Sequence, residues 1–267
     1  MATTADSSSK AVLRALSMLE AIAESEKGLT NAELSKQLSV PKSTASYLLH
    51  ALEARGYLHR AETTNEYTLG LQILHLSHAV LAHMDLRKVA VPHLARFVEK
   101  TGLPAHLAIL ERGRAVYVEK VEAEDNFVRM DTRVGKRVPV HTTAIGKVLT
   151  APLPDAAVLQ ILEERGMERH TAETMITPAR FLHELEKVRR QGYAQDNEEN
   201  SLGVRCLAAP VQDAAGKVIA AVGTSGTTSH IHESVLPGII AHIQRTAQDI
   251  ASDLGYTRTV VSDQKRA

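Results

Sequence analysis

The stretch VPKSTASYLLHALEARGYL, residues 40–58, constrains the fold of this chain more than any other part of the sequence. Pro41 suits the first turn of a helix, and Gly56 suits the residue just past its end. Between them, apolar residues recur at i, i+3, i+4 and i+7, which predicts a helix with one buried face made of Ala45, Leu48, Leu49 and Leu52. Polar residues fall on the opposite side, so this helix offers hydrogen-bonding groups to a partner.

Two further helices are predicted ahead of this one. Residues 11–25, AVLRALSMLEAIAES, carry an apolar stripe at helical spacing, made of Val12, Leu16, Leu19, Ile22 and Ala23. After Gly28, the segment LTN supplies caps for a short helix, AELSKQL, with Leu34 and Leu38 on one side. Two short helices joined by a tight turn, the second with a polar face, form a helix-turn-helix, whose second helix can enter the major groove of DNA.

The next residues add a wing to this unit. Residues 57–70, YLHRAETTNEYTLG, predict two short strands around the polar turn TTN. Between Lys36 and Arg60 there are four basic residues and one acidic residue, 4 − 1 = +3, which gives charge for phosphate contacts. A three-helix packing module with a solvated polar face would show the same periodicity, but the order of the elements favours DNA binding. The predicted DNA contacts are Lys42, Ser43, Thr44, Ser46, Tyr47, His50, Arg55 and Arg60.

A linker helix is predicted over residues 71–84. Its apolar stripe starts at the end of the wing and consists of Leu69, Ile73, Leu76 and Val80, which suits pairing with a second subunit. His75, His78 and His83 lie along it, but no carboxylate or cysteine completes a ligand set, so no metal site is predicted.

From Leu103 onward the pattern changes to strands, in HLAILER, RAVYVEKVE and NFVRMDTRV. A helix is expected from about Thr143, and two amphipathic helices follow in PDAAVLQILEERG and TPARFLHELEKVRRQGY. A hairpin in GVRCLAAPVQDAAGKVIAAVGTSG and a long helix in HESVLPGIIAHIQRTAQDIASDLG complete the pattern. Grouped strands flanked by helices predict an α+β domain with an antiparallel sheet.

Composition excludes several other classes of protein. Lys plus Arg number 31, as do Asp plus Glu, so the chain does not coat DNA by bulk charge. Aromatic residues make up only 3%, which argues against stacking platforms for single strands. The lone Cys206 allows no internal disulfide and no multi-cysteine zinc site. The opening MATTADSSSK lacks an apolar core and no apolar run approaches ~20 residues, so we expect a cytoplasmic protein without a membrane span.

Four stretches together resemble a known family. PKSTASYLLHALEARGYLHR, HTTAIGKVL, GYAQDNEENSLGVRCLAAPV and GTSG are similar to signature stretches of the IclR (isocitrate lyase regulator) family, and within it to its sugar-acid (ketodeoxygluconate-type) regulators. The resemblance runs from about Ala11 to Tyr256. It implies a winged helix-turn-helix followed by a GAF-like effector-binding domain, and a homodimer or homotetramer that represses or activates transcription.

The resemblance also gives domain boundaries and a candidate pocket. We expect a disordered tail at 1–9, the DNA-binding domain at 10–70, the linker helix at 71–84, the effector-binding domain at 85–257 and a flexible tail at 258–267. The family's effector pocket maps onto Phe127, Met130, Val138, Ala144, Ile145, Gly146, Asp196, Val204, Cys206, Gly223 and Ser225. Free N–H groups at the start of the Thr143 helix would favour a carboxylate, whereas Lys147 is expected to point along that helix without touching the ligand.

One position departs from the family pattern. Tyr47 stands where relatives often have an arginine in the recognition helix, and tyrosine cannot make the bidentate guanine contact that arginine makes. The operator sequence therefore cannot be borrowed from relatives.

The predicted function is ligand-responsive regulation of a catabolic operon, with a repressor favoured over an activator. The partners would be a palindromic DNA operator, a sugar, keto or aromatic acid, and a second copy of the chain, with no cofactor. The alternative is a small-molecule hydrolase with a vestigial winged helix, since His141, Asp196 and Cys206 are the residue types that a thiol hydrolase needs. Cys206 lies in an apolar run, which argues against a reactive thiol. A third possibility is an adaptor whose winged helix binds another protein.

Overall fold

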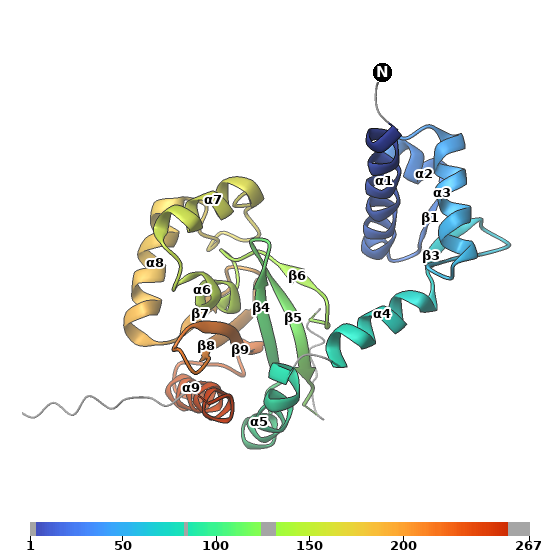
Figure 1. Cartoon of the computed structure of the whole chain (residues 1–267). Coiled ribbons are helices and arrows are strands. Elements are labelled where there is room, and N and C mark those ends of the chain that lie inside the picture. Colours follow the sequence, from blue (N-terminus) through green and yellow to red (C-terminus); the bar gives the residue numbers. More distant parts are fainter. Residues whose placement is uncertain (1–3, 83–84, 124–131, 256–267) are drawn as a thin grey trace, which may run out of the picture. The chain divides into compact units, whose positions relative to one another are not determined.

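The computed structural model describes residues 4–82, 85–123 and 132–255 of the chain. It divides into two compact units, Met1–His83 and Met84–Ala267, each with its own hydrophobic core (Figure 1).

The first unit is a winged helix-turn-helix. Its helices are α1 (Thr4–Glu24), α2 (Asn31–Gln37), α3 (Lys42–Ala54) and α4 (Leu71–Ala82). Its strands are β1 (Leu29–Thr30), β2 (Leu58–Arg60) and β3 (Glu66–Leu69), which form an antiparallel sheet in the order β1-β3-β2. The three-helix core and the β2–β3 wing confirm the predicted architecture. The two-residue strand β1 was too short to be predicted from alternation.

Local signals in the sequence explain where these helices begin and end. Thr30 and Glu33 form a reciprocal capping box at the start of α2. Pro41 occupies the N-cap of α3, one position before the predicted first turn. Gly56 follows the end of α3 with a φ of 74°, a conformation that glycine adopts without steric cost. The predicted inner face of α3 is buried, with Ala45 and Leu49 fully enclosed.

The structure corrects two expectations for α1. The helix begins at Thr4, so residues 4–9 are helical instead of forming part of a disordered tail; none of them is Gly or Pro, and nothing in the sequence stops the helix there. The predicted apolar stripe is only half buried, because Val12 and Leu16 are 59% and 51% exposed. Helix α1 is longer than α2 and α3, and only its second half, at Met18 and Ile22, lies in the core.

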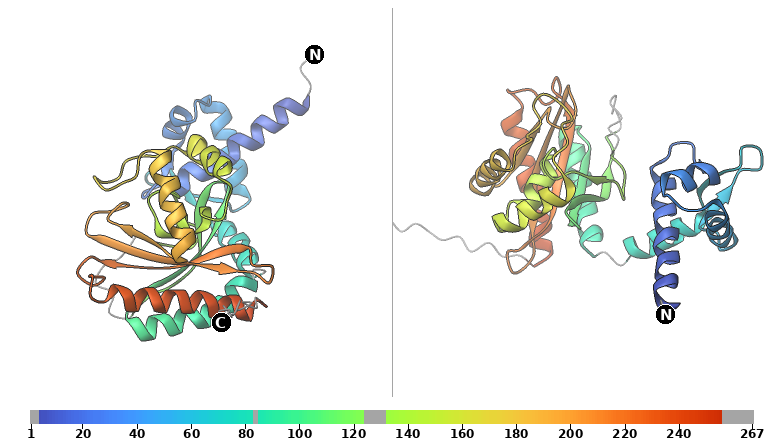
Figure 2. Two further views of the ribbon diagram at one scale, coloured as in Figure 1. Left: turned by 90° about the vertical axis from the view of Figure 1, so that its left-hand side faces the viewer. Right: turned by 90° about the horizontal axis from the view of Figure 1, so that it is seen from above.

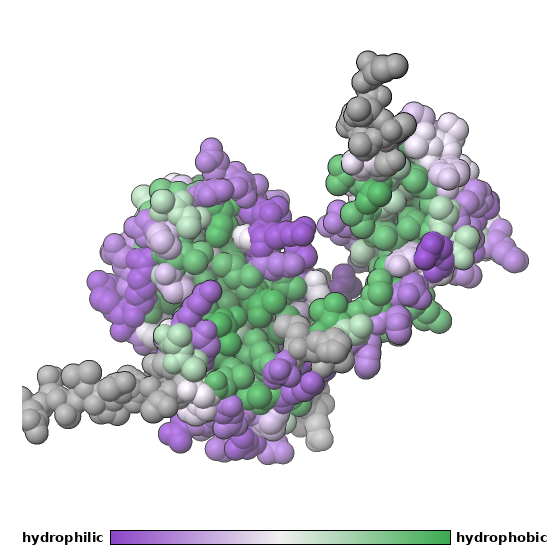
Figure 3. Space-filling model, in the orientation of Figure 1, coloured by the Kyte–Doolittle hydropathy of each residue, from purple (hydrophilic) through white to green (hydrophobic). Residues whose placement is uncertain are grey.

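Helix α4 confirms that the predicted linker is helical, up to the gap at residues 83–84. Four of its apolar side chains are exposed, namely Leu71, Leu74, Leu76 and Val80. Apolar side chains accordingly gather at the surface over α1 and α4 (Figure 3).

The second unit is an antiparallel sheet between two layers of helices (Figure 2). The described strands are β4 (Ala105–Glu111), β5 (Arg114–Val121), β6 (Arg137–Val138), β7 (Ala194–Asn197), β8 (Val204–Gln212) and β9 (Val218–Thr227), in the order β6-β5-β4-β9-β8-β7. One face packs against α5 (Asp85–Thr101) and α9 (Leu236–Asp253). The other packs against α6 (Ala144–Thr150), α7 (Asp155–Arg165) and α8 (Pro178–Gln191). This arrangement confirms the predicted α+β class.

Turn chemistry fixes two of the hairpins. Arg112 and Gly113, between β4 and β5, both have positive φ, 46° and 73°, as a two-residue hairpin turn of this hand requires. Between β8 and β9, Asp213 accepts hydrogen bonds from the N–H groups of Ala215 and Lys217 through its carboxylate. The β8–β9 hairpin confirms the one predicted for residues 203–226.

One predicted strand differs from the structure. Residues 126–131 of the expected strand NFVRMDTRV lie outside the described part of the chain, and residues 132–134 are not extended into a strand. A turn at Gly135, with a φ of 85°, interrupts the pattern there. Backbone pairing with β5 resumes at Lys136, whose carbonyl accepts from the N–H of Tyr117 at 3.1 Å, and continues in β6.

Helix α6 lies unusually close to its surroundings, because two glycines allow it. A Cβ atom at Gly146 would stand 2.4 Å from the Cα of Val140. A Cβ atom at Gly223 on β9 would stand 2.7 Å from Cγ2 of Ile145. All residues of α6 are consequently buried.

Replacing Gly146 by alanine should therefore destabilise the second unit. Gly146→Ala forces α6 away from Val140, and overpacking of this kind costs about 1–3 kcal/mol or more. Gly238→Ala is the control, since nothing lies within 4 Å of a Cβ there and alanine favours the helix by about 1 kcal/mol. Thermal unfolding should show a lower Tm for the first variant and an unchanged or higher Tm for the second. Equal Tm values would contradict the close approach of α6.

Candidate functional site

The polar face of α3 is open to solvent in the first unit. Lys42 and Ser43 are exposed at the start of the helix, and Tyr47 is 75% exposed one turn later. His50 and Arg55 are also exposed, whereas Thr44 and Ser46 are half-buried. The predicted DNA-contacting residues of α3 thus share the side of the helix that faces away from the core.

Arg60 is the exception among the predicted contacts, because it is held within the wing. Its guanidinium donates to the side-chain oxygen of Asn65 at 2.5 Å and lies over the ring of Tyr67, 5.8 Å from the centroid. Asn65 has a φ of 59° and shapes the wing turn. Arg60 therefore fixes the turn between β2 and β3 as well as adding positive charge to it.

A cavity of about 240 Å³ lies in the second unit, on the sheet face that α6 covers. The predicted effector residues that line it are Val138, Ala144, Ile145, Asp196, Cys206, Gly223 and Ser225. These residues come from four strands and from the start of α6. The fold therefore brings together residues up to 87 positions apart, from Val138 to Ser225, around one space.

Two of the predicted pocket residues do not line the described cavity, and two others lie outside the described residues. Gly146 packs against Val140, and its N–H donates to Oγ1 of Thr143, so it shapes α6 without facing the ligand space. Val204 begins β8 and lies outside the lining. Phe127 and Met130 fall outside the described residues.

The cavity also has lining residues that the sequence interpretation missed. They are His106, Tyr117, Thr132, Lys136, Thr143, Asn200, Ser201, Leu207 and Thr224. His106 of β4 stands opposite Gly223 of β9, a pairing that depends on the strand register. The polar run after Asp196 was the one available signal in the sequence for Asn200 and Ser201.

Asp196 is the buried acid of the cavity, and its side chain is 1% exposed. Its Oδ1 accepts hydrogen bonds from the N–H groups of Glu199 and Asn200, at 2.8 and 3.3 Å. Its Oδ2 is buried and has no hydrogen-bond partner among the described residues. Burial, and after it the negative charge of Glu199, raises the pKa of Asp196 to about 7.

Three further titratable groups of the cavity, His106, Tyr117 and Cys206, are uncharged near neutral pH. Burial, and after it the charge of Lys120, lowers the pKa of His106 to about 4, so its ring is neutral. Its Nε2 lies 3.0 Å from Oγ of Ser225. Burial raises the pKa of Tyr117. Cys206 is reached from the cavity but is otherwise enclosed, and burial followed by the charge of Asp196 raises the pKa of its thiol.

This chemistry suits binding and does not suit a thiol hydrolase. A nucleophilic cysteine needs a lowered pKa and an adjacent base, whereas the pKa of Cys206 is raised. His141 does not line the cavity; its Nε2 lies 3.0 Å from the carbonyl oxygen of Glu168. The three residues of the hydrolase alternative are therefore not assembled.

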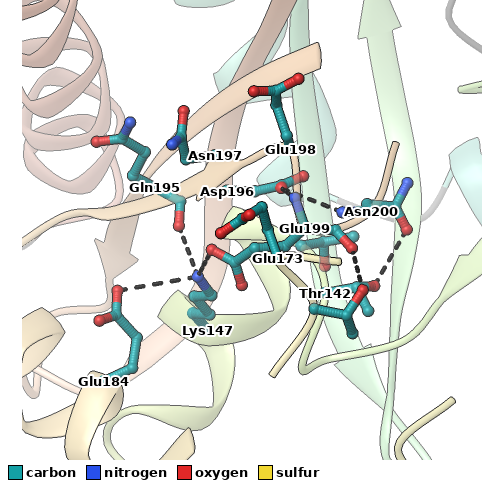
Figure 4. Close-up of polar contacts among 12 residues, drawn as sticks. Thr142, Lys147, Glu173, Glu184, Gln195, Asp196, Asn197, Glu198, Glu199 and Asn200 are labelled. Atoms are coloured by element: carbon teal, nitrogen blue, oxygen red, sulfur yellow. Dashed lines mark hydrogen bonds and ion pairs between the residues drawn. The ribbon is translucent and has the colours of Figure 1, made fainter. Parts of the chain in front are cut away.

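Lys147 was expected to point along α6 with no need to touch the ligand; it does not line the cavity, but it has partners that the sequence did not predict. It is completely buried, and its ammonium donates to Oε1 of Glu199 at 2.6 Å and to the carbonyl oxygen of Gln195 at 2.7 Å (Figure 4). The sequence offered no signal for this contact, since Lys147 and Glu199 are 52 residues apart.

No helix in the described part of the chain is long and apolar enough to cross a membrane. No group of three or more His, Cys, Asp or Glu side chains in that part of the chain is arranged to hold a metal ion.

Comparison with known proteins shows which family the chain belongs to. The model of the IclR helix-turn-helix domain matches residues 11–62, and that of the bacterial transcriptional regulator IclR C-terminal domain matches residues 78–252. The chain belongs to the IclR family of bacterial transcriptional regulators. The resemblance inferred from the sequence is thereby confirmed, and the hydrolase alternative finds no support among the relatives.

Individual relatives agree with this assignment. The Escherichia coli regulators XynR and KdgR are each 35% identical over 92% of this chain, covering 98% and 92% of their own lengths. The repressor AllR of Salmonella typhi is 30% identical over 94% of the chain and 92% of its own length. Among solved structures, Thermotoga maritima IclR aligns with a TM-score of 0.72 at 28% identity, over 92% of this chain and 99% of its own. The C-terminal domain of E. coli KdgR aligns at 35% identity with a TM-score of 0.59, over 65% of this chain and all of its own.

The raised pKa of Asp196 predicts how pH affects the stability of the second unit. In the unfolded chain Asp196 ionises near its ordinary pKa of 3.8, but in the folded chain it ionises near 7. The folded state therefore binds more protons between these values, and stability falls as pH rises from about 4 to about 7. The loss is on the order of 4 kcal/mol, since each pKa unit corresponds to about 1.4 kcal/mol.

Asp196→Asn should remove this loss, because asparagine keeps the Oδ1 acceptor and carries no charge. We expect Tm of the variant minus Tm of the wild type to increase from pH 5 to pH 8 in thermal unfolding. A difference that is independent of pH would show that Asp196 ionises in the folded protein as it does in the unfolded chain.

Proposed function

We propose that the chain represses a catabolic operon in the cytoplasm, by binding a palindromic operator through α3 and the wing and responding to a small organic acid in the cavity. The observation that carries this proposal is the combination of an exposed polar recognition face in one unit with an enclosed polar cavity in the other. Enclosed cavities with a few convergent polar groups are typical of small-molecule sites.

The lining of the cavity favours a sugar acid over an aromatic acid. Hydroxyl groups of Tyr117 and of five serine or threonine residues surround the space, namely Thr132, Thr143, Ser201, Thr224 and Ser225. Each can donate or accept, which suits a ligand with several hydroxyls. Lys136 lies in the lining and supplies positive charge for a carboxylate. Thr143 and Thr224 already donate to the carbonyl oxygens of Pro139 and Pro104, whereas Oδ2 of Asp196 has no hydrogen-bond partner among the described residues. An aromatic ring without hydroxyls would leave that buried oxygen without a donor, which costs free energy.

We further propose that two copies associate through the exposed apolar surfaces of α1 and α4. These surfaces include Val12, Leu13 and Leu16 on α1 and Leu71, Leu74 and Val80 on α4. Apolar side chains gathered in this way mark an interaction surface. A two-fold dimer would present two α3 helices to two half-sites, which is the geometry that a palindromic operator requires.

A mobility-shift assay with the DNA upstream of the gene tests the proposed function. We expect a sequence-selective complex that D-gluconate weakens and that benzoate, an aromatic acid of equal charge, leaves intact. Lys42→Gln should weaken binding and reduce the salt slope of log K by about one unit, because one phosphate contact is lost.

Lys217→Gln is the matched control for this assay, since it removes an exposed lysine from the second unit. Its DNA affinity and salt slope should equal those of the wild type. The absence of any sequence-selective complex, with and without acids, would rule out the proposed function. A response to benzoate instead of D-gluconate would rule out the sugar-acid class alone.

Sedimentation equilibrium tests the proposed dimer surface. Leu74→Glu introduces a charge into the apolar surface of α4, so the variant should dissociate at concentrations where the wild type is associated. Leu202→Glu is the control, because Leu202 is similarly exposed, at 72%, but lies in the second unit. Equal association of Leu74→Glu and the wild type would exclude this surface.

A further inference from the structure

We propose that Lys147 and Glu199 are positioning residues for effector binding: their buried ion pair holds the turn that carries Asp196 and Asn200 to the cavity. This inference rests on the proposed function of the cavity. It assigns a role to two residues that do not line that cavity themselves.

Lys147 of α6 contacts groups from β7, from the turn after β7 and from α8. Its ammonium contacts Glu199 at 2.6 Å, the carbonyl oxygen of Gln195 in β7 at 2.7 Å and the carboxylate of Glu184 in α8 at 3.8 Å (Figure 4). A buried ammonium without partners would be very costly, so these contacts confine α6, β7 and the turn after β7 to one arrangement.

The turn itself, residues 196–201, is built around backbone groups that need external partners. Asp196 accepts hydrogen bonds from the N–H groups of Glu199 and Asn200. Glu198 has a φ of 62°, a backbone conformation that residues other than glycine rarely adopt. From outside the turn, Thr171 and Thr174 donate to the carbonyl oxygens of Glu198 and Glu199, both at 2.7 Å. Hydrogen bonds on one side and the ion pair on the other thus hold an unfavourable backbone conformation.

The same helix serves the cavity and the ion pair. Ala144 and Ile145, at the start of α6, line the cavity, and Lys147 follows within the same turn of helix. Thr142, just before α6, donates to the side-chain oxygen of Asn200 at 3.1 Å (Figure 4). A ligand between α6 and Asp196 would therefore touch two walls whose separation the Lys147–Glu199 contact sets.

The pair also sets the electrostatic surroundings of Asp196. The charge of Glu199 raises the pKa of Asp196 and the charge of Lys147 lowers it. The remaining titratable or charged groups near Asp196 are Glu184 of α8 behind Lys147, Cys206 of β8, Tyr117 of β5, and His106 and Lys136 in the cavity lining. Near neutral pH, Cys206, Tyr117 and His106 are uncharged, so the ion pair is a main source of charge close to this carboxyl.

A double variant separates positioning from simple stabilisation. Lys147→Met with Glu199→Gln removes both buried charges, and such replacements are often neutral for stability. We expect the full-length double variant to fold, with a Tm near that of the wild type, but to bind D-gluconate about tenfold more weakly in calorimetry, as is typical when coupled neighbours are lost. Glu186→Gln, an exposed substitution on α8, is the control and should bind as the wild type does.

A single variant adds a readout that a merely structural role would not move. Glu199→Gln leaves the charge of Lys147 beside Asp196, so the pKa of Asp196 should fall below that of the wild type. Carboxyl ¹³C NMR of aspartate-labelled protein measures this titration without any effector, and Asp196→Asn assigns the signal. The double variant lacks both the charge of Glu199, which raises the pKa of Asp196, and the charge of Lys147, which lowers it. The titration midpoint of Asp196 should therefore differ less from the wild-type value than it does in Glu199→Gln.

The outcomes are distinct. Weaker binding by a folded double variant, with a lowered Asp196 midpoint in Glu199→Gln, supports the proposal. Binding of D-gluconate at wild-type affinity by the double variant, or an unchanged midpoint in Glu199→Gln, overturns it. If neither D-gluconate nor D-galacturonate binds the wild type, the sugar-acid function fails, and the NMR titration alone decides whether the pair governs Asp196.

Discussion

The close packing of α6 against the sheet is the constraint on which the second unit depends. Gly146 and Gly223 let the helix approach the backbone of Val140 and the face of β9 at distances that a side chain would forbid. The helix is then buried along its whole length, and Lys147 with it. A buried ammonium requires compensation, which the turn after β7 provides through Glu199. The cavity, with Asp196 in its wall, is formed where that turn meets the start of α6.

The lysine side chain of α3 in the first unit is exposed, whereas Lys147 of the second unit is buried. At the start of α3, Lys42 is exposed, so its charge remains available to a polyanion. In the second unit, the charge of Lys147 is enclosed and neutralised, and burial leaves His106 uncharged. A chain that is neutral overall can therefore bind DNA locally, while His106, Tyr117 and Cys206 in the cavity stay uncharged.

The sequence predicted the first unit better than the cavity of the second, for a physical reason. Helix caps, the apolar spacing of α3 and the glycine after its end, Gly56, are local signals. The partners of the capping box, Thr30 and Glu33, are only three positions apart. The cavity depends on strand register and on contacts between distant residues, such as His106 opposite Gly223 and Lys147 beside Glu199. No spacing rule connects residues 52 or 117 positions apart. The family resemblance supplied Asp196 and Cys206, but it also included Gly146, which serves packing.

A buried ion pair adds little net stability compared with apolar side chains of the same volume, so its presence behind the cavity calls for another explanation. Apolar packing is non-directional and would tolerate small shifts of the turn after β7. The Lys147 ammonium instead requires its oxygen partners at hydrogen-bond distance, which fixes Asp196 relative to Ala144 and Ile145. A ligand can shift a conformational equilibrium only through contacts that differ between the states. Walls held at a fixed separation make such contacts sensitive to small displacements, and this precision suits the effector site proposed above.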